Sequence, residues 1–383
     1  MSATARLAEF TVKTSLDECP PEAVARVRLA ALDTLGVMLA GAAEPAAAAV
    51  RSLARAEGGA ALCTVVGTQL VTAPGWAALA NGTAGHAHDF DDTNFALMGH
   101  PSAPLLATCL AAGEAEMADG RALVTAYLVG FEVSATLGRA LNPAHYTRGW
   151  HATSSIGTLG CAAAAARLLG LDATQTRHAF AIAASHASGL KENFGSMTKP
   201  YHAGHAARGG VLAAQLAREG LTASETALEG RQGYVAAFGG SGSLDRALDE
   251  LGRTWQLLAS GIAVKPYPSC ALTHPAIDTL LELRATHGLA PADVAAVEVG
   301  VNRVVPDVLA HARPTTPLER KFSMQYCAAA ALAEGRVDLA SFEDGEIRDP
   351  DVRRLMARVT MVVDPALPDG LAQHAWSRVT LRQ

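Results

Sequence analysis

Alanine-rich, aromatic-poor stretches constrain the fold of this chain more than any other feature. Of its 383 residues 50% are hydrophobic but only 5% are aromatic, and alanine runs such as CAAAAARLLG at 161–170 supply the surplus. Alanine is the best helix former and a poor filler of strands. The sequence therefore predicts closely packed helices rather than a β-sandwich, and its length favours two domains.

The character of the chain changes near residue 263. Before it, helical periodicity and capping signals predict an all-helical domain over residues 1–262, with helices that include 15–42, 47–57 and 73–92. After it, alternating apolar residues predict strands at 295–302, 358–364 and 377–383, together with a helix at 321–335. We predict a mainly α fold: a large all-helical domain and a smaller α+β lid domain over 263–383. The chain stops directly after a strand, which indicates a truncated C-terminus.

Charge, targeting signals and cysteines narrow the classes of function. The net charge of −6 argues against a nucleic-acid partner, because phosphate contacts need a basic face. We find no secretory peptide and no apolar stretch long enough to predict a membrane span. The six cysteines are scattered without a Cys-x-x-Cys pair, which favours reduced cytoplasm over a disulfide or zinc framework. FGGSGS at 238–243 lacks the third glycine of a dinucleotide-binding fingerprint and is predicted to be a loop.

An unusually dense group of ionisable side chains lies between residues 81 and 104: His86, His88, Asp89, Asp91, Asp92 and His100. Burying so many imidazoles and carboxylates is costly unless they are solvated, metal-bound or catalytic. At 3.6 residues per turn, the predicted helix places His86, Asp89 and Thr93 on one face. That face is predicted to line a site, which leaves Asp91 and Asp92 for capping, hydrogen bonding or solvent.

A second group surrounds Lys199 in KENFGSMTKPYHAGHAARGG at 191–210. The chain has only five lysines, so a retained lysine can mark a place that needs a compact ammonium. Lys199 stands at a predicted helix start, where free backbone N–H groups favour an anion, and His202 follows it. His151 precedes residues that can cap the next helix, so its imidazole is predicted to project from a helix N-terminus.

Six segments together resemble the MmgE/PrpD family in order and spacing: NGTAGHAHDFDDT, GHPSAP, GWHATSSIGTLG, NFGSMTKPYHAGHAARGG, KPYPSCALTH and KFSMQYC. That family includes 2-methylcitrate dehydratases, cis-aconitate decarboxylases and iminodisuccinate epimerases. The resemblance implies a large helical domain, a smaller α+β lid, a homodimer and a site in the cleft between the domains. It also implies cofactor-free chemistry without a metal, and a chain that normally continues and returns to the helical domain.

Carried over residue by residue, the resemblance implies a set of catalytic side chains: Asp89, His100, His151, Lys199, Lys265 and Tyr326. Substrate contacts are implied for Thr93, His202, Cys270 and His274. Two positions favour different activities within the family. Cis-aconitate decarboxylases have a histidine where this chain has Cys270, which is like the epimerases, whereas Tyr326 is like the decarboxylases.

The residues and the resemblance agree on proton abstraction next to a carboxylate, and the resemblance implies a cofactor-free lyase acting on a small di- or tricarboxylate. Lysines would neutralise the carboxylates, and His100, His151 or a lysine of lowered pKa would remove the proton next to one of them, with loss of water or CO₂. Asp89 would orient an imidazole, and Tyr326 or a second histidine would act as the acid. The alternative is an epimerase of an iminodisuccinate-like dicarboxylate that uses the same proton transfer.

Two rival classes stay open at this point. A metal-dependent hydrolase would take its ligands from His86, His88 and the neighbouring aspartates, although on a helix these two histidines point to different faces. A non-catalytic carboxylate-binding protein would be stabilised by its ligand but would exchange no proton with solvent.

Overall fold

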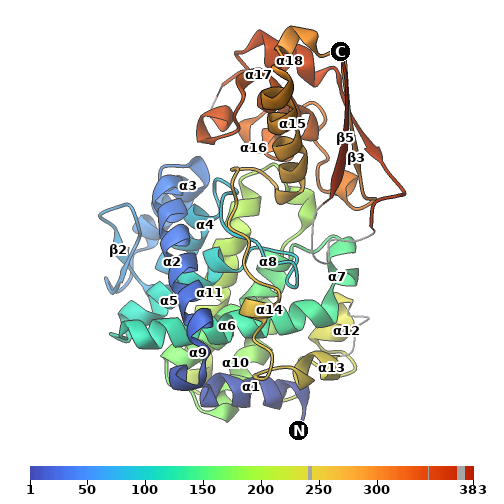
Figure 1. Ribbon diagram of the computed structural model, residues 1–383. Helices are drawn as coiled ribbons and strands as arrows, with labels where there is room; N and C mark the ends of the chain where they lie inside the picture. Colours follow the sequence, from blue (N-terminus) through green and yellow to red (C-terminus); the bar gives the residue numbers. More distant parts are fainter. Residues whose placement is uncertain (240–243, 344, 369–375) are drawn as a thin grey trace. The chain divides into compact units, whose positions relative to one another are not determined.

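The computed structural model describes residues 1–239, 244–343, 345–368 and 376–383 (Figure 1). The chain divides into two compact units. The helical unit comprises Met1–Ala87, Asp91–Lys191 and Thr198–Val264, and the α+β unit comprises His88–Phe90, Glu192–Met197 and Lys265–Gln383. The α+β unit therefore includes two short segments from within the histidine- and lysine-bearing motifs.

The helical unit consists of helices and one small hairpin of β1 and β2, which the sequence did not predict. Its elements are α1 (Ala3–Lys13), η1 (Leu16–Glu18), α2 (Pro21–Gly41), α3 (Pro45–Glu57), β1 (Cys63–Thr64), β2 (Val71–Thr72), α4 (Pro74–Gly85), α5 (Ser102–Ala115), α6 (Gly120–Leu141), α7 (Ala144–Thr147), α8 (Ala152–Ser155), α9 (Gly157–Leu168), α10 (Ala173–His186), α11 (Thr198–Arg218), α12 (Tyr234–Phe238), α13 (Leu244–Asp249) and α14 (Gln256–Ala259). The predicted mainly α class is confirmed. Most of the predicted loop at 238–243 lies outside the described residues.

Two predicted helices have different bounds in the structure. The helix predicted over 15–42 begins only at Pro21, because Ser15 caps the short turn η1 instead. The helix predicted over 73–92 ends at Gly85, and Asp89 has a φ of +51°. A left-handed residue cannot continue a right-handed helix, although a short polar side chain tolerates that conformation. The helical phase that grouped residues 86, 89 and 93 is therefore wrong.

Small residues let α4 and α11 pack closely. A Cβ added to Gly82 would lie 2.7 Å from Cα of Gly204, and one added to Gly204 would lie 2.2 Å from the backbone oxygen of Leu79. At the other end of the same crossing, the Arg208 guanidinium lies 4.2 Å from the ring centroid of Trp76. These pairs show that the two helices run antiparallel, so the end of α4 meets the start of α11.

Buried alanines build much of the rest of this core. Residues 162–166 of α9 are at most 1% exposed, and they allow α6 and α11 to pack directly on α9. Asp172 and Gln175 form a capping box at the start of α10, and Asp119 caps α6. Local capping and small side chains thus explain where these helices start and how closely they pack.

The α+β unit is built on a three-stranded sheet in the order β4-β3-β5 (Figure 1). Strand β3 (Ala296–Val301) pairs in parallel with β4 (Val359–Val363) and antiparallel with β5 (Ser377–Arg382). Its described helices and turns are η2 (Lys191–Asn193), η3 (Ala271–Thr273), α15 (His274–His287), η4 (Pro291–Asp293), η5 (Val305–Asp307), α16 (Pro317–Arg320), α17 (Met324–Glu334), η6 (Leu339–Phe342) and α18 (Pro350–Met356). The three strands and the alanine-rich helix predicted from the sequence are confirmed.

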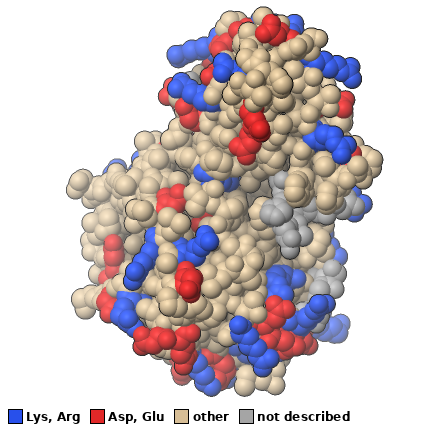
Figure 2. All heavy atoms as spheres, viewed as in Figure 1, with Lys and Arg blue, Asp and Glu red and all other residues tan. Residues whose placement is uncertain are grey.

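The surface carries mixed charge. On the face shown in Figure 2, basic and acidic side chains alternate over the helical unit. Among the described residues, no helix is both long and apolar enough to cross a membrane. All six cysteines are free thiols, and five of them are buried.

Candidate active site

His86 and Lys199 come together at the crossing of α4 and α11. His86 directly follows α4, and Lys199 lies in the first turn of α11. Nζ of Lys199 lies 2.7 Å from Nε2 of His86. An ammonium can only donate, so Nε2 of His86 is the acceptor in this hydrogen bond. Both side chains are buried, so the contact excludes water.

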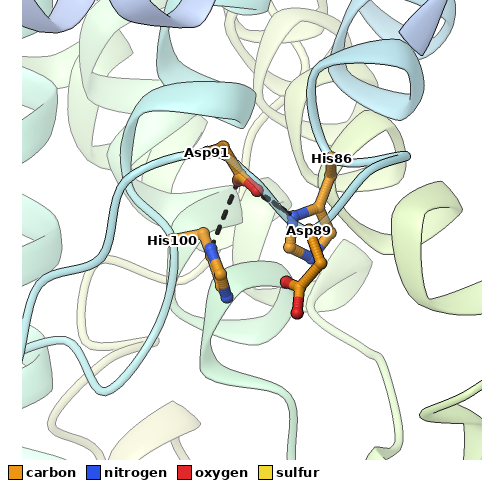
Figure 3. Close-up of side chains that lie close together, drawn as sticks. All are labelled: His86, Asp89, Asp91 and His100. Atoms are coloured by element: carbon orange, nitrogen blue, oxygen red, sulfur yellow. Dashed lines mark hydrogen bonds and ion pairs between the residues drawn. The ribbon is translucent and has the colours of Figure 1, made fainter. Parts of the chain in front are cut away.

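Asp91 lies between two imidazoles (Figure 3). Nδ1 of His86 lies 2.8 and 2.9 Å from the two carboxylate oxygens of Asp91. Nδ1 of His100 lies 3.3 Å from Oδ2 of the same carboxylate. The two imidazole rings meet edge to face with centroids 4.4 Å apart. One carboxylate thus contacts two of the three histidines of this motif.

The loop that carries His100 is held against α8. The backbone N–H of His100 donates to Oγ1 of Thr153 over 2.9 Å. A Cβ on Gly99 would lie 2.9 Å from the Thr153 backbone nitrogen, so only glycine permits this approach. Thr93, earlier in the loop, exchanges backbone hydrogen bonds of 3.0 and 2.8 Å with Ala263.

Charges in this cluster follow from burial and neighbours. Burial, and then the nearby Lys199, lower the pKa of His86 to about 3 against the opposing effect of Asp91. Burial alone would raise the pKa of the Asp91 carboxyl, but His86 and His100 outweigh it and hold that pKa below its usual range. At neutral pH the cluster therefore contains an ionised Asp91 and a neutral His86.

His151 and His202 form a second imidazole pair in the helical unit. His151 occupies the N-cap position of α8, as the sequence predicted for a residue just ahead of a helix. Its Nδ1 lies 3.1 Å from Nδ1 of His202, so one ring donates and the other accepts. Burial and the Lys199 charge lower the pKa of both rings, that of His202 to about 4. Neutral imidazoles at this position are available as proton acceptors.

Asp92, next to Asp91, has a different environment. Ser102 donates to Asp92 from both its backbone N–H and its hydroxyl, and the hydroxyl also contacts the Tyr127 hydroxyl. Burial, with the charge of the neighbouring Asp91, raises the pKa of Asp92 to about 8 despite the Ser102 hydrogen bonds, which lower it. Asp92 is therefore protonated at neutral pH, and the ionised carboxylate that contacts His86 and His100 is that of Asp91.

The α+β unit has a lysine and carboxylate cluster of its own. Nζ of Lys265 lies 3.1 Å from Oδ1 of Asp89 and donates to the backbone oxygens of Asp89 and Ser269 over 2.7 and 3.0 Å. Lys321 donates to the backbone oxygens of His88 and Pro268 over 2.9 and 3.0 Å. The short segment of residues 88–90 is thus held by two buried lysines.

The remaining predicted residues of this unit lie around the same turn. Nε2 of His274 lies 3.1 Å from the Ser269 oxygen, and burial lowers its pKa to about 3. The Cys270 backbone N–H donates to the Lys321 oxygen over 2.9 Å. Tyr326 is buried, and its hydroxyl donates to the backbone oxygen of Ser341.

The structure thus distributes the sequence-predicted residues between the two units. The helical unit contains Thr93, His100, His151, Lys199 and His202, and the α+β unit contains Asp89, Lys265, Cys270, His274 and Tyr326. Sequence reasoning missed the contact of Asp91 with His86 and the buried position of Lys321. The scarcity of lysine could have singled out Lys321, one of five in the chain.

The motif of residues 81–104 could also bind a metal ion. Ligand atoms of His86, Asp91 and His100 lie within 4.8 Å of one another, and imidazole and carboxylate donors suit zinc. However, Nδ1 of both histidines faces Asp91, and Nε2 of His86 faces an ammonium. A divalent cation here would displace these hydrogen bonds and lie close to the positive charge of Lys199. The donor set does not fit a metal while Lys199 is charged.

The fold and site define a class of protein: a mainly helical unit with a buried carboxylate, histidine and lysine cluster, followed by a small α+β unit with buried lysines. Comparison with known proteins identifies the family. Residues 5–247 match the MmgE/PrpD N-terminal domain and residues 267–383 match the MmgE/PrpD C-terminal domain. The chain belongs to the MmgE/PrpD family.

Relatives in this family carry the names of lyases. Cis-aconitate decarboxylase from Homo sapiens is 34% identical over 325 residues, 81% of this chain and 66% of the relative. The Mus musculus enzyme of that name is 34% identical over 77% of this chain and 62% of its own length. The 2-methylcitrate dehydratase of Cupriavidus necator is 30% identical over 26% of this chain and 22% of its own length. The chain thus spans less than two thirds of the length of the two mammalian relatives.

Proposed function

We propose that this chain is a cofactor-free lyase that acts on a small di- or tricarboxylate. The carrying observation is the pairing of an ammonium, Lys199, with a carboxylate-held histidine cluster in one buried site of the helical unit. The names of the relatives, cis-aconitate decarboxylase and 2-methylcitrate dehydratase, support the same substrate class.

The proposed chemistry begins with removal of a proton from the carbon next to a carboxylate. That proton becomes acidic only when positive charge stabilises the enolate-like intermediate, and Lys199 and Lys265 are the proposed sources of this charge. His100 or His151 is the proposed base, because each is neutral or lies beside a carboxylate. The intermediate then loses water or CO₂, with Tyr326 as the proposed acid. Thr93, His202, Cys270 and His274 are proposed to contact the substrate, and Asp89 is proposed to fix Lys265.

An epimerase of an iminodisuccinate-like dicarboxylate is the second candidate. It would use the same first proton transfer and return the proton to the opposite face of the carbon. The cysteine at position 270, where family decarboxylases have a histidine, favours this candidate over cis-aconitate decarboxylation.

Proton exchange in deuterated buffer tests the proposal. The chain is incubated with 2-methylcitrate, citrate, cis-aconitate and iminodisuccinate, and NMR follows deuterium next to each carboxylate together with the products. The lyase predicts exchange accompanied by an alkene product or CO₂, whereas the epimerase predicts exchange with a change of configuration only. Ligand-induced stabilisation without exchange would indicate a binding protein. Stoichiometric zinc, with activity lost on chelation, would indicate the metal-dependent hydrolase.

We also propose that the chain forms a homodimer through α2. Leu29, Leu32 and Leu39 are 51%, 70% and 57% exposed, and with Gly36 they form one stripe along this helix. An exposed apolar stripe of this spacing suits packing against a second copy of the same helix.

A further inference from the structure

We propose that Asp91 is the positioning residue of the helical unit's site: it holds His86 so that His86 accepts a hydrogen bond from the Lys199 ammonium, and it orients His100 through Nδ1 so that Nε2 is directed away from Asp91. This inference deepens the proposed function and rests on it only for its kinetic consequence. The predicted hydrogen-bond arrangement itself can be tested without any substrate.

The first step concerns which nitrogen carries the proton. An ionised carboxylate only accepts hydrogen bonds, so each imidazole nitrogen that faces it must carry a hydrogen. Nδ1 of His86 faces Asp91 at 2.8 Å and Nδ1 of His100 faces it at 3.3 Å. A neutral imidazole has a single N–H. Both rings therefore carry a hydrogen on Nδ1, and the neutral His86 has its lone pair on Nε2.

The second step concerns Lys199. Its Nζ lies 2.7 Å from Nε2 of His86, and an ammonium needs an acceptor there. The other tautomer would place N–H against N–H at this distance. Asp91 therefore acts on Lys199 through His86, 113 residues distant in sequence from the lysine.

The third step concerns His100. Its Nε2 points away from Asp91 in Figure 3, and its side chain is 12% exposed where that of Asp91 is fully buried. The carboxylate at Nδ1 orients this ring, and when His100 is neutral Nε2 is its basic nitrogen. One buried negative charge thus orients two imidazoles, one of which contacts Lys199.

An asparagine at position 91 cannot do the same. It has one acceptor oxygen and one NH₂ group, so it can keep only one imidazole as the Nδ1–H tautomer and must donate to the other. Asp92→Asn is the matched control. Asp92 is the next residue, is equally buried, and contacts Ser102 rather than an imidazole.

The test combines ring NMR with kinetics on the full chain. The 13 histidines are labelled with ¹⁵N, and long-range proton–nitrogen spectra report the tautomer of each ring. His86→Gln and His100→Gln spectra assign the two signals. We expect both rings as Nδ1–H in the parent and in Asp92→Asn, and a switch of at least one ring in Asp91→Asn.

In the kinetic arm, Asp91→Asn should lower kcat by about 10²-fold or more, within the range of general acid–base effects, while Asp92→Asn stays within about threefold. A parent spectrum with His86 as Nε2–H, or identical tautomers in both asparagine variants, would overturn the inference. The tautomer can switch in Asp91→Asn while the parent chain exchanges no proton of any carboxylate tested. That result would leave the positioning inference intact and would contradict the proposed function instead.

Discussion

Lys199 donates a hydrogen bond to Nε2 of His86 across 2.7 Å, although 113 residues separate them in the chain. The contact exists because α4 and α11 cross at paired glycines, which brings the end of one helix to the start of the other. Because His86 is itself held by Asp91, the three residues form one hydrogen-bonded line from carboxylate to ammonium.

Replacing Lys199 with alanine should abolish proton exchange while the fold is retained. The substitution removes the cation proposed to stabilise the intermediate, a loss of about 10²-fold or more. Deuterium incorporation and thermal melting by circular dichroism measure the two effects. Lys13→Ala is the control, because Lys13 is 75% exposed and pairs with Glu9 in the same helix. Equal exchange by both variants would refute the assignment of Lys199.

Gly82→Ala should destabilise the helical unit and reduce activity together. Its Cβ would lie 2.7 Å from Cα and 2.9 Å from N of Gly204, so the two helices must separate. Overpacking of this kind costs about 1–3 kcal/mol. Gly75→Ala on the same helix is the control, since its nearest neighbour would be an Arg208 side-chain carbon at 3.7 Å. Urea denaturation that shows equal stability for the two variants would contradict the close crossing.

Asp92→Asn should stabilise the chain increasingly as pH rises from 5 to 8. The pKa of Asp92 is about 8 in the folded state, above the value of about 3.9 for an unfolded aspartate. The folded state therefore keeps a proton that the unfolded state has lost, and parent stability falls through this window. Asparagine does not titrate, so its advantage over the parent should grow by about 2 kcal/mol or more.

Urea denaturation at both pH values measures the difference. Asp119→Asn is the control, because Asp119 caps α6 at the surface and its substitution should shift stability equally at pH 5 and pH 8. A constant difference between parent and Asp92→Asn across the window would show that Asp92 is ionised.

Leu32→Glu should convert the proposed dimer into folded monomers. Leu32 is 70% exposed, so a carboxylate is solvated in the monomer but would be buried against a second α2. Light scattering after size-exclusion chromatography reports the mass. Met117→Glu, at a 92% exposed apolar position away from α2, serves as the control. A monomeric parent chain would end the proposal of a dimer through this face.

The sequence predicted those features that depend on residues close together in the chain. Alanine content and capping signals predicted the mainly helical unit, and alternating valines such as Val297 and Val299 predicted the strands that the structure contains. The motif set predicted the family, which the comparisons confirm. The sequence also singled out His100, His151 and Lys199, which the structure brings into one unit.

Other features depended on how separate segments meet. The helix expected to run through residue 92 ends at Gly85, the chain turns at the left-handed Asp89, and Asp91 hydrogen-bonds to Nδ1 of His86. Periodicity along one segment cannot show such a turn. Nor can it show that residues 88–90 are held by Lys265 and Lys321, which follow much later in the chain.

By itself, the sequence determined the helical class and the strands near its end, because composition and local periodicity encode secondary structure directly. Its set of motifs identified the family. Only the tertiary structure decided the roles within the acidic motif. It left Asp91 charged between two imidazoles and Asp92 protonated against Ser102, although the two residues are adjacent and chemically identical. The physical reason is that burial penalises both charges alike, whereas the two imidazoles beside Asp91 lower its pKa and the charge of Asp91 raises the pKa of Asp92.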